Sequence, residues 1–195
     1  MSIYKAPDVD LSVEYCGIRF DSPFVLASAP PTDTYEMVRD AFRAGWAGAV
    51  LKTTAMEDYV VDIAYPVLAG VRYQGNLVGF GNIDNISEFH MDKMEEAVRL
   101  LKKEFPEKIV ATSVWGTTKE SWQRLAQRSR EAGADYMEVS MSCPTDSPIE
   151  GRTLMIGQVA AQAYKVVSWL VEASDGLPVV PKLSGDVTDI LSHAQ

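Results

Sequence analysis

The chain alternates short apolar runs with longer segments in which apolar residues recur at steps of three and four. The first pattern is typical of buried strands and the second of amphipathic helices. Strands are predicted at 24–27, 48–52, 108–114, 135–140 and 178–183. Helices are predicted at roughly 34–44, 91–105, 117–131 and 156–173, and another begins at 188.

Capping signals mark the boundaries of two of these helices. Asp33, followed three residues later by Glu36, predicts the start of the first helix, and Gly45 lies just past its end. Thr117 and Glu120 have the spacing of a capping box at the start of the third helix. In both cases an Ala–Gly pair ends the helix and a strand follows at once, which predicts short connections.

Two segments lie outside this alternation. Residues 11–23, LSVEYCGIRFDSP, alternate polar and apolar side chains around Gly17 and predict a β-hairpin before the first strand. In this hairpin Cys16 is expected to pack as a small apolar residue. The long segment 53–90 contains YPVLAGVRYQGN and is expected to carry a hairpin or lid of its own.

Five strands alternating with helices predict an α/β fold whose strands pair in parallel through right-handed crossovers. No GxGxxG motif follows the first strand, which counts against a dinucleotide-binding fold. Polar residues gather instead at the carboxyl ends of the strands: Ser28, Lys52, Ser113, Ser140, Cys143 and Lys182. Because chemistry in (β/α)8 barrels collects at that end, the pattern favours a TIM-barrel fold.

Composition narrows the class of protein. The 195 residues are enough for one domain, and the apolar fraction of 47% is that of an ordinary globular chain. A net charge of -9 argues against general binding to nucleic acid or an anionic membrane. The sequence has no apolar run long enough for a bilayer, and residues 1–10 do not resemble a signal peptide, so a cytoplasmic location is expected. It has no metal-ligand spacing either.

Lys52 and Lys182 each end a predicted buried strand, where an unpaired ammonium is costly to desolvate. Either the two side chains reach solvent at the rim of a barrel, or they share a site and hold an anionic or electron-rich ligand. Both interpretations are compatible with the sequence.

Cys143 lies on a polar loop just beyond a strand, and three roles are open for it. A nucleophile needs a neighbouring base, and no histidine is near in the sequence. A proton donor needs only a position against the substrate and a loop that excludes water, for which TDSPIEGR (145–152) is a candidate. The third possibility is an incidental loop thiol.

Five ordered segments carry a resemblance to a known family. LASAPPTDTYEM, AGWAGAVLKT, GNIDNISE, SCP and PKLSGDVTDI resemble segments of the dihydroorotate/dihydropyrimidine dehydrogenases in order and spacing, especially those of bacterial NAD-dependent flavin-bearing subunits. The resemblance implies FMN across the carboxyl-terminal mouth of a (β/α)8 barrel. It also implies hydride exchange with C6 of a pyrimidine such as uracil, thymine or dihydroorotate.

The resemblance further implies roles for individual residues. Cys143 matches the loop cysteine that exchanges the C5 proton and is the expected catalytic residue. The residues expected at the cofactor are Ala27, Ser28, Lys52, Thr53, Ser113 and Lys182. The residues expected at the substrate are Asn82, Ser140 and Ser142. Electrons are expected from an NAD(P)H-using electron-transfer subunit, because this chain has no nicotinamide-binding fingerprint or cluster cysteines.

The chain departs from the family pattern in two ways. Ser140 stands where the family usually has asparagine, so the substrate is expected to be a different ring or a water to fill the gap. The family barrel also has three further strands with the phosphate-binding glycine loops. Residues 1–195 are therefore expected to form an incomplete FMN-binding barrel of about five of eight strands. It is either a truncated copy or one part of a barrel that a homo-oligomer or another chain completes.

Two alternatives remain open at this point. One is a catalytically silent half-barrel that folds only against a partner chain. The other is a flavin barrel of the tRNA-dihydrouridine synthase kind, which also uses a loop cysteine. The acidic net charge of -9 counts against the second.

Overall fold

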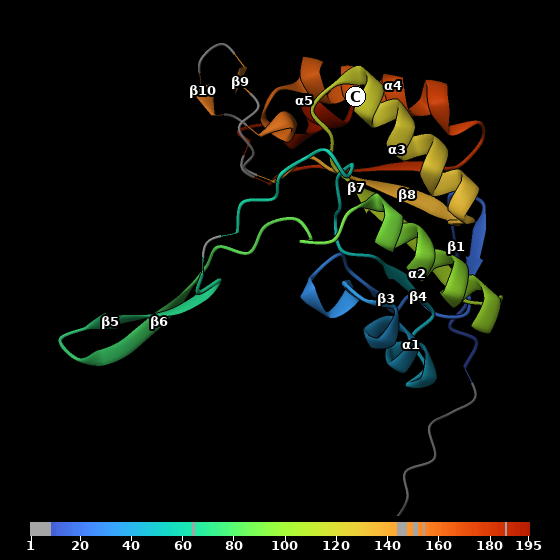
Figure 1. The fold of residues 1–195 in the computed structure, drawn as a ribbon, viewed down its shortest axis with the longest axis horizontal. Coiled ribbons are helices and arrows are strands. Elements are labelled where there is room, and N and C mark those ends of the chain that lie inside the picture. Colours follow the sequence, from blue (N-terminus) through green and yellow to red (C-terminus); the bar gives the residue numbers. More distant parts are fainter. Residues whose placement is uncertain (1–8, 64, 144–147, 150–151, 154, 186) are drawn as a thin grey trace, which may run out of the picture.

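The computed structural model describes residues 9–63, 65–143, 148–149, 152–153, 155–185 and 187–195. Its centre is a sheet of five parallel strands in the order β11-β8-β7-β4-β3 (Figure 1). The strands are β3 (Val25–Leu26), β4 (Gly48–Val50), β7 (Ile109–Val114), β8 (Tyr136–Ser140) and β11 (Val179–Lys182). The predicted parallel α/β architecture is confirmed.

Four helices run along one side of this sheet (Figure 1). They are α1 (Tyr35–Arg43), α2 (Met91–Glu104), α3 (Lys119–Ala132) and α4 (Ala160–Ser174). The short elements are the 3-10 turns η1 (Pro30–Thr32) and η2 (Ile156–Gln158), the strands β9 (Pro148–Ile149) and β10 (Arg152–Thr153), and the helix α5 (Ile190–Ala194). Each predicted helix corresponds to one of these elements.

The three central strands, β4, β7 and β8, are buried on both faces, as is usual for parallel strands. On the helical side, Ala49, Val110 and Met137 join a large core with the apolar stripes of the helices. On the opposite side, alternate residues of the same strands form a smaller apolar cluster with Phe20: Val50, Ile109, Ala111 and Tyr136. This second cluster is the floor on which the candidate site lies.

Two predicted helix starts are wrong by one residue. Thr34, rather than Asp33, caps α1 by accepting a hydrogen bond from the backbone N–H of Met37. The Asp33 carboxylate is engaged elsewhere, because it accepts a hydrogen bond from the Ser87 hydroxyl. Thr118, rather than Thr117, caps α3 and forms the capping box with Ser121 in place of Glu120.

The hairpin before the first parallel strand is confirmed as β1 (Val13–Tyr15) and β2 (Ile18–Phe20). The expected packing of Cys16 is wrong. Cys16 is exposed at the turn with a φ of 54° and is followed by Gly17 at a φ of 74°. This turn needs left-handed backbone at both positions, so the cysteine side chain points away from the core.

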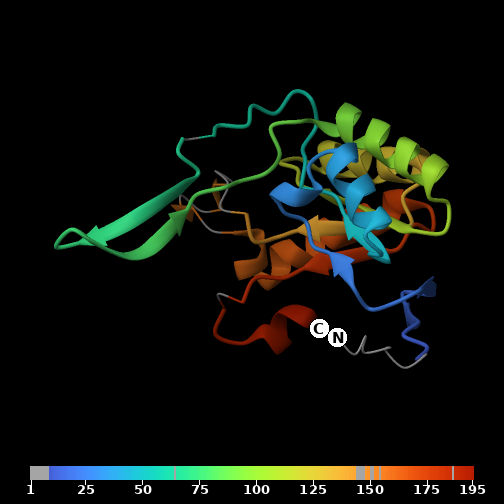
Figure 2. The ribbon, with the colours of Figure 1, turned by 90° about the horizontal axis from the view of Figure 1, so that it is seen from below.

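A second hairpin, β5 (Leu68–Tyr73) and β6 (Asn76–Asn82), confirms the hairpin predicted in segment 53–90. It projects far beyond the rest of the molecule in both views (Figures 1 and 2). After β6 the chain returns to the carboxyl end of the parallel sheet, where Asp84 pairs with Lys52.

The parallel sheet is open. Within the described ranges, β3 and β11 each pair with one strand only and form the two edges. No helix in the described part of the chain is long and apolar enough to cross a membrane.

Candidate functional site

A cavity of about 240 Å³ lies at the carboxyl ends of the parallel strands. The residues that line it are Ser28, Ala29, Lys52, Thr53, Asp84, Asn85, Ser140, Ser142, Cys143 and Lys182. Seven of the ten residues predicted from sequence are among them. They come from segments up to about 150 residues apart in the chain, and only the parallel sheet brings them together.

The period of two along each strand explains why polar side chains meet here. Val50, Ala111 and Tyr136 belong to the apolar floor cluster. Two residues beyond each of them, on the same face, stand Lys52, Ser113 and Glu138. The inner face of the sheet therefore changes from apolar to polar at one level, where the strands end.

A row of hydrogen bonds crosses the sheet at this level. The Ser28 and Thr53 hydroxyls are 3.1 Å apart, and the Ser28 oxygen accepts the Thr53 backbone N–H at 2.9 Å. The Thr53 and Ser113 hydroxyls are 2.8 Å apart, and Ser113 donates to Glu138 Oε1 at 3.0 Å. Lys182 Nζ donates to the same oxygen at 2.6 Å.

Both predicted lysines are ion-paired. Lys52, whose side chain is only 8% exposed, donates to both carboxylate oxygens of Asp84 at 2.8 and 2.9 Å. Lys182 pairs with Glu138. Two ammonium groups thus face two carboxylates, so the lysines do not give the site a net positive charge.

The Cys143 thiol is half-buried, and its Sγ lies 3.1 Å from Ser140 Oγ. Burial raises the pKa of Cys143, and the negative charges of Glu138 and Asp84 raise it further. The hydrogen bond with Ser140 and the positive charge of Lys182 act in the opposite direction and only partly offset the burial. The thiol is therefore held in its protonated form at neutral pH.

Three predicted residues do not line the cavity. Ser113 is fully buried directly beneath it, in the hydrogen-bonded row. Ala27 is exposed, and its carbonyl oxygen accepts a hydrogen bond from the Thr32 hydroxyl. Asn82 is exposed at the end of β6, and its side-chain oxygen accepts the backbone N–H of Asp84 at 2.8 Å.

The sequence interpretation missed Ala29 and three polar residues of the site, Asp84, Asn85 and Glu138. Glu138 could have been found from the sequence. It lies two residues from both Tyr136 and Ser140, so all three share one face of a predicted buried strand, where a carboxylate needs a partner. Asp84 and Asn85 follow an irregular hairpin, and no periodic signal marks them. Of the loop predicted at 145–152, only Pro148 and Ile149 in β9 and Arg152 in β10 lie among the described residues.

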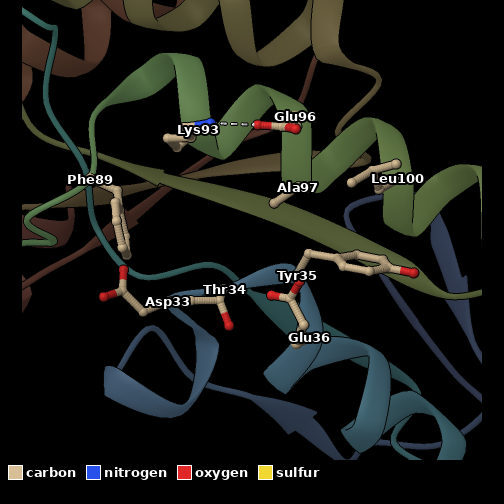
Figure 3. Close-up of a pocket in the computed structure, with 9 residues that line it drawn as sticks. All are labelled: Asp33, Thr34, Tyr35, Glu36, Phe89, Lys93, Glu96, Ala97 and Leu100. Carbon is tan, nitrogen blue, oxygen red and sulfur yellow. Dashed lines mark hydrogen bonds and ion pairs between the residues drawn. The ribbon is translucent and has the colours of Figure 1, made fainter.

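A groove of about 200 Å³ between α1 and α2 contains none of the ten residues predicted for the cofactor, substrate or catalytic site (Figure 3). Tyr35 and Glu36 of α1 face Ala97 and Leu100 of α2 across it. Its one lysine, Lys93, is paired with Glu96. Within the described residues, no group of His, Cys, Asp and Glu could hold a metal ion.

Comparison with protein families and curated proteins gives two results. No family model matches the chain. The chain is 30% identical over 189 residues to the NAD-dependent dihydropyrimidine dehydrogenase subunit PreA of Escherichia coli (strain K12). The aligned region covers 95% of this chain and 44% of that protein. It is 32% identical to the chloroplastic dihydropyrimidine dehydrogenase (NADP(+)) of Arabidopsis thaliana, covering 95% of this chain and 45% of that protein.

A third relative is the catalytic subunit of dihydroorotate dehydrogenase B (NAD(+)) of Pyrococcus abyssi, 32% identical over 92% of this chain and 56% of its own length. The chain thus spans about half the length of the curated relatives it matches.

Among solved structures, morphinone reductase matches 93% of this chain and 63% of its own, with a TM-score of 0.57 at 12% identity. A second structure of morphinone reductase, in complex with tetrahydroNAD, has a TM-score of 0.52. These likenesses concern the fold alone, and they confirm the N-terminal part of a TIM barrel. The resemblance read from the sequence motifs is also confirmed: the chain is similar, along 92–95% of its length, to part of the dihydropyrimidine and dihydroorotate dehydrogenases.

Proposed function

We propose that this chain is the N-terminal part of an FMN-dependent oxidoreductase that acts on the C5–C6 bond of a pyrimidine such as uracil, thymine or dihydroorotate. One observation carries the proposal. A protonated thiol, Cys143, and two lysines, Lys52 and Lys182, line one cavity at the carboxyl ends of parallel strands. The dehydrogenases to which the chain is similar support the reaction class.

The residues present fit the ring of a flavin better than its phosphate. A cavity of about 240 Å³ is small beside the roughly 300–1,000 Å³ of a complete ligand site. Its lining offers ammonium donors at Lys52 and Lys182, which suit an electron-rich ring, and a hydroxyl at Ser28. Bound FMN would supply the hydride chemistry at C6. Thr53, which lines the cavity, Ser113 beneath it and Ala27 beside Ser28 would complete the cofactor-binding side.

In this proposal Cys143 holds the proton that is exchanged with C5 of the pyrimidine. Its raised pKa keeps that proton on sulfur at neutral pH, as a general acid requires. Ser142 and Asn82 would orient the pyrimidine ring. Ser140 lines the cavity beside the substrate, and its hydroxyl also contacts the Cys143 thiol, so it would influence the proton donor as well as the ring.

The proposal includes two partners. Similarity to proteins described as an NAD-dependent subunit and a catalytic subunit supports an electron-transfer subunit that uses NAD(P)H. The open edges at β3 and β11 support a chain or second copy that completes the barrel.

The test is the visible spectrum and FMN content of the purified chain, alone and after reconstitution with excess FMN. The proposal expects a flavin spectrum and quenching of FMN fluorescence by the chain, and reduction of uracil or oxidation of dihydroorotate when an electron donor or acceptor is supplied. A folded, oligomeric chain that quenches no FMN fluorescence and turns over no pyrimidine would contradict it.

A further inference from the structure

The carboxylate of Glu138 lies at the centre of the site without lining the cavity. It projects from β8 onto the inner face of the sheet, between β7 and β11, and is 13% exposed. One of its oxygens, Oε1, accepts hydrogen bonds from Ser113 Oγ at 3.0 Å and from Lys182 Nζ at 2.6 Å. A single atom therefore holds one cavity lysine and the end of a row of hydroxyls.

An ionised carboxylate can only accept hydrogen bonds, and this fixes the direction of the row. Because Ser113 gives its proton to Glu138, its oxygen must accept from Thr53, 2.8 Å away. Thr53 has then used its only hydroxyl proton, so it accepts from Ser28, 3.1 Å away. All three hydroxyl protons point toward Glu138.

The consequence appears at Ser28, which lines the cavity. Its proton is directed at Thr53, and one lone pair accepts the Thr53 backbone N–H. What remains toward the cavity is the second lone pair, which is an acceptor. Ser28 thus favours a ligand edge that carries an N–H over one that carries a carbonyl.

We propose that Glu138 is a positioning residue for the bound ring. It fixes the Lys182 ammonium at one side of the cavity and, through Ser113 and Thr53, makes Ser28 an acceptor for a ring N–H at the other side. This inference rests on the proposed function for its ligand. The oxidised flavin ring carries a single N–H, at N3, so the N3 edge of the ring is assigned to Ser28.

Two variants separate the two tasks. Glu138→Gln keeps the shape but removes the charge, and its amide N–H can reverse the hydroxyl row. Ser113→Ala cuts the row and leaves the Glu138–Lys182 pair intact. Circular dichroism and thermal melting would establish that both variants are folded before either is compared with the unmodified chain.

The first measurement needs no flavin. Acetylation of lysines by a limiting amine-reactive ester, followed by peptide mass spectrometry, gives the relative reactivity of each amine. In Glu138→Gln, Lys182 should react about tenfold faster, because its ammonium loses the hydrogen bond to a charged carboxylate that protects it in the unmodified chain. Lys52, paired with Asp84, is the internal control, and Ser113→Ala should leave Lys182 unchanged. Equal Lys182 reactivity in the unmodified chain and Glu138→Gln would overturn the lysine-holding role.

The second measurement compares the affinities for lumiflavin and 3-methyllumiflavin by fluorescence quenching. The unmodified chain should prefer lumiflavin by about tenfold, since the methyl group removes one hydrogen bond and adds bulk. Glu138→Gln and Ser113→Ala should both lose most of this preference. A preference retained in both variants would overturn the role of the hydroxyl row. A chain that binds neither compound would overturn the proposed function and the ring-selecting role, while lysine reactivity still decides the other role.

Discussion

At the scale of single residues, Cys143 differs from Cys16 in everything that matters for proton transfer. Cys143 shares a cavity with two lysines, whereas Cys16 is exposed at a hairpin turn. Cys143→Ala should slow pyrimidine turnover by about 10²–10⁴-fold, the usual contribution of general acid–base catalysis, and leave FMN affinity almost unchanged. Steady-state turnover and FMN fluorescence titration measure the two effects. Cys16→Ser is the matched control, and parallel loss of turnover and FMN affinity in Cys143→Ala would indicate a structural role instead.

The hydrogen bond between Ser140 and Cys143 makes a prediction about pH. Burial raises the pKa of the thiol above its ordinary value of 9.0, and the Ser140 hydroxyl partly offsets this by stabilising the thiolate. Ser140→Ala should therefore move the pKa of Cys143 further up. In a Cys16→Ser background Cys143 is the single cysteine, so the pH dependence of iodoacetamide alkylation reports this thiol alone. A pH profile that is unmoved or shifted downward in Ser140→Ala would show that the hydroxyl does not stabilise the thiolate.

At the scale of secondary-structure elements, an ion pair at the opposite end of the sheet joins a helix to two strands. Lys102, near the end of α2, donates to both Asp135 oxygens at 3.0 and 2.9 Å and to the Lys108 carbonyl at 3.0 Å. Asp135 also accepts the Val110 backbone N–H at 2.8 Å. Removing the carboxylate leaves a partly buried ammonium and a buried amide with one fewer partner each.

Asp135→Ala should therefore lower the free energy of unfolding by about 2–3 kcal/mol, as expected for hydrogen bonds to charged groups. Urea denaturation followed by circular dichroism measures the change. The matched control is Lys93→Ala, which breaks the exposed pair with Glu96 and should cost under about 1 kcal/mol. Similar losses in the two variants would mean that the Lys102–Asp135 pair adds nothing beyond an ordinary surface pair.

What the sequence could predict follows from the range of the forces involved. The strand and helix order depends on local apolar periodicity, so 108–114 and 91–105 were predicted within one residue of β7 and α2. The cap at Asp33 was wrong because that carboxylate binds Ser87, 54 residues away. Asp84 was missed for the same reason, since only folding brings it to Lys52. Partners distant in sequence leave no local pattern.

At the scale of the whole molecule, net charge separates the pyrimidine proposal from a tRNA-modifying barrel. With a net charge of -9, the chain lacks the long-range attraction that drives binding to phosphate backbones. Filter-binding experiments with unmodified tRNA should therefore show no retention at physiological salt and little at low salt. Salt-sensitive retention at micromolar chain would favour the dihydrouridine synthase alternative over free pyrimidines.

The open edge beside β11 makes the last prediction, about assembly. An apolar cavity of about 600 Å³ lies between α4, β11 and α5, and Tyr164 on α4 lines it while remaining 75% exposed. Exposed strand edges and apolar patches of this kind are normally covered, so the chain on its own should self-associate.

Sedimentation velocity should show species heavier than a monomer, and their share should grow with chain concentration. Tyr164→Glu should reduce this association without changing the melting temperature. Val171→Glu, also exposed on α4 but not lining the cavity, should have no effect. A compact monomer at every concentration would instead mean that the open five-stranded sheet is stable without a covering partner.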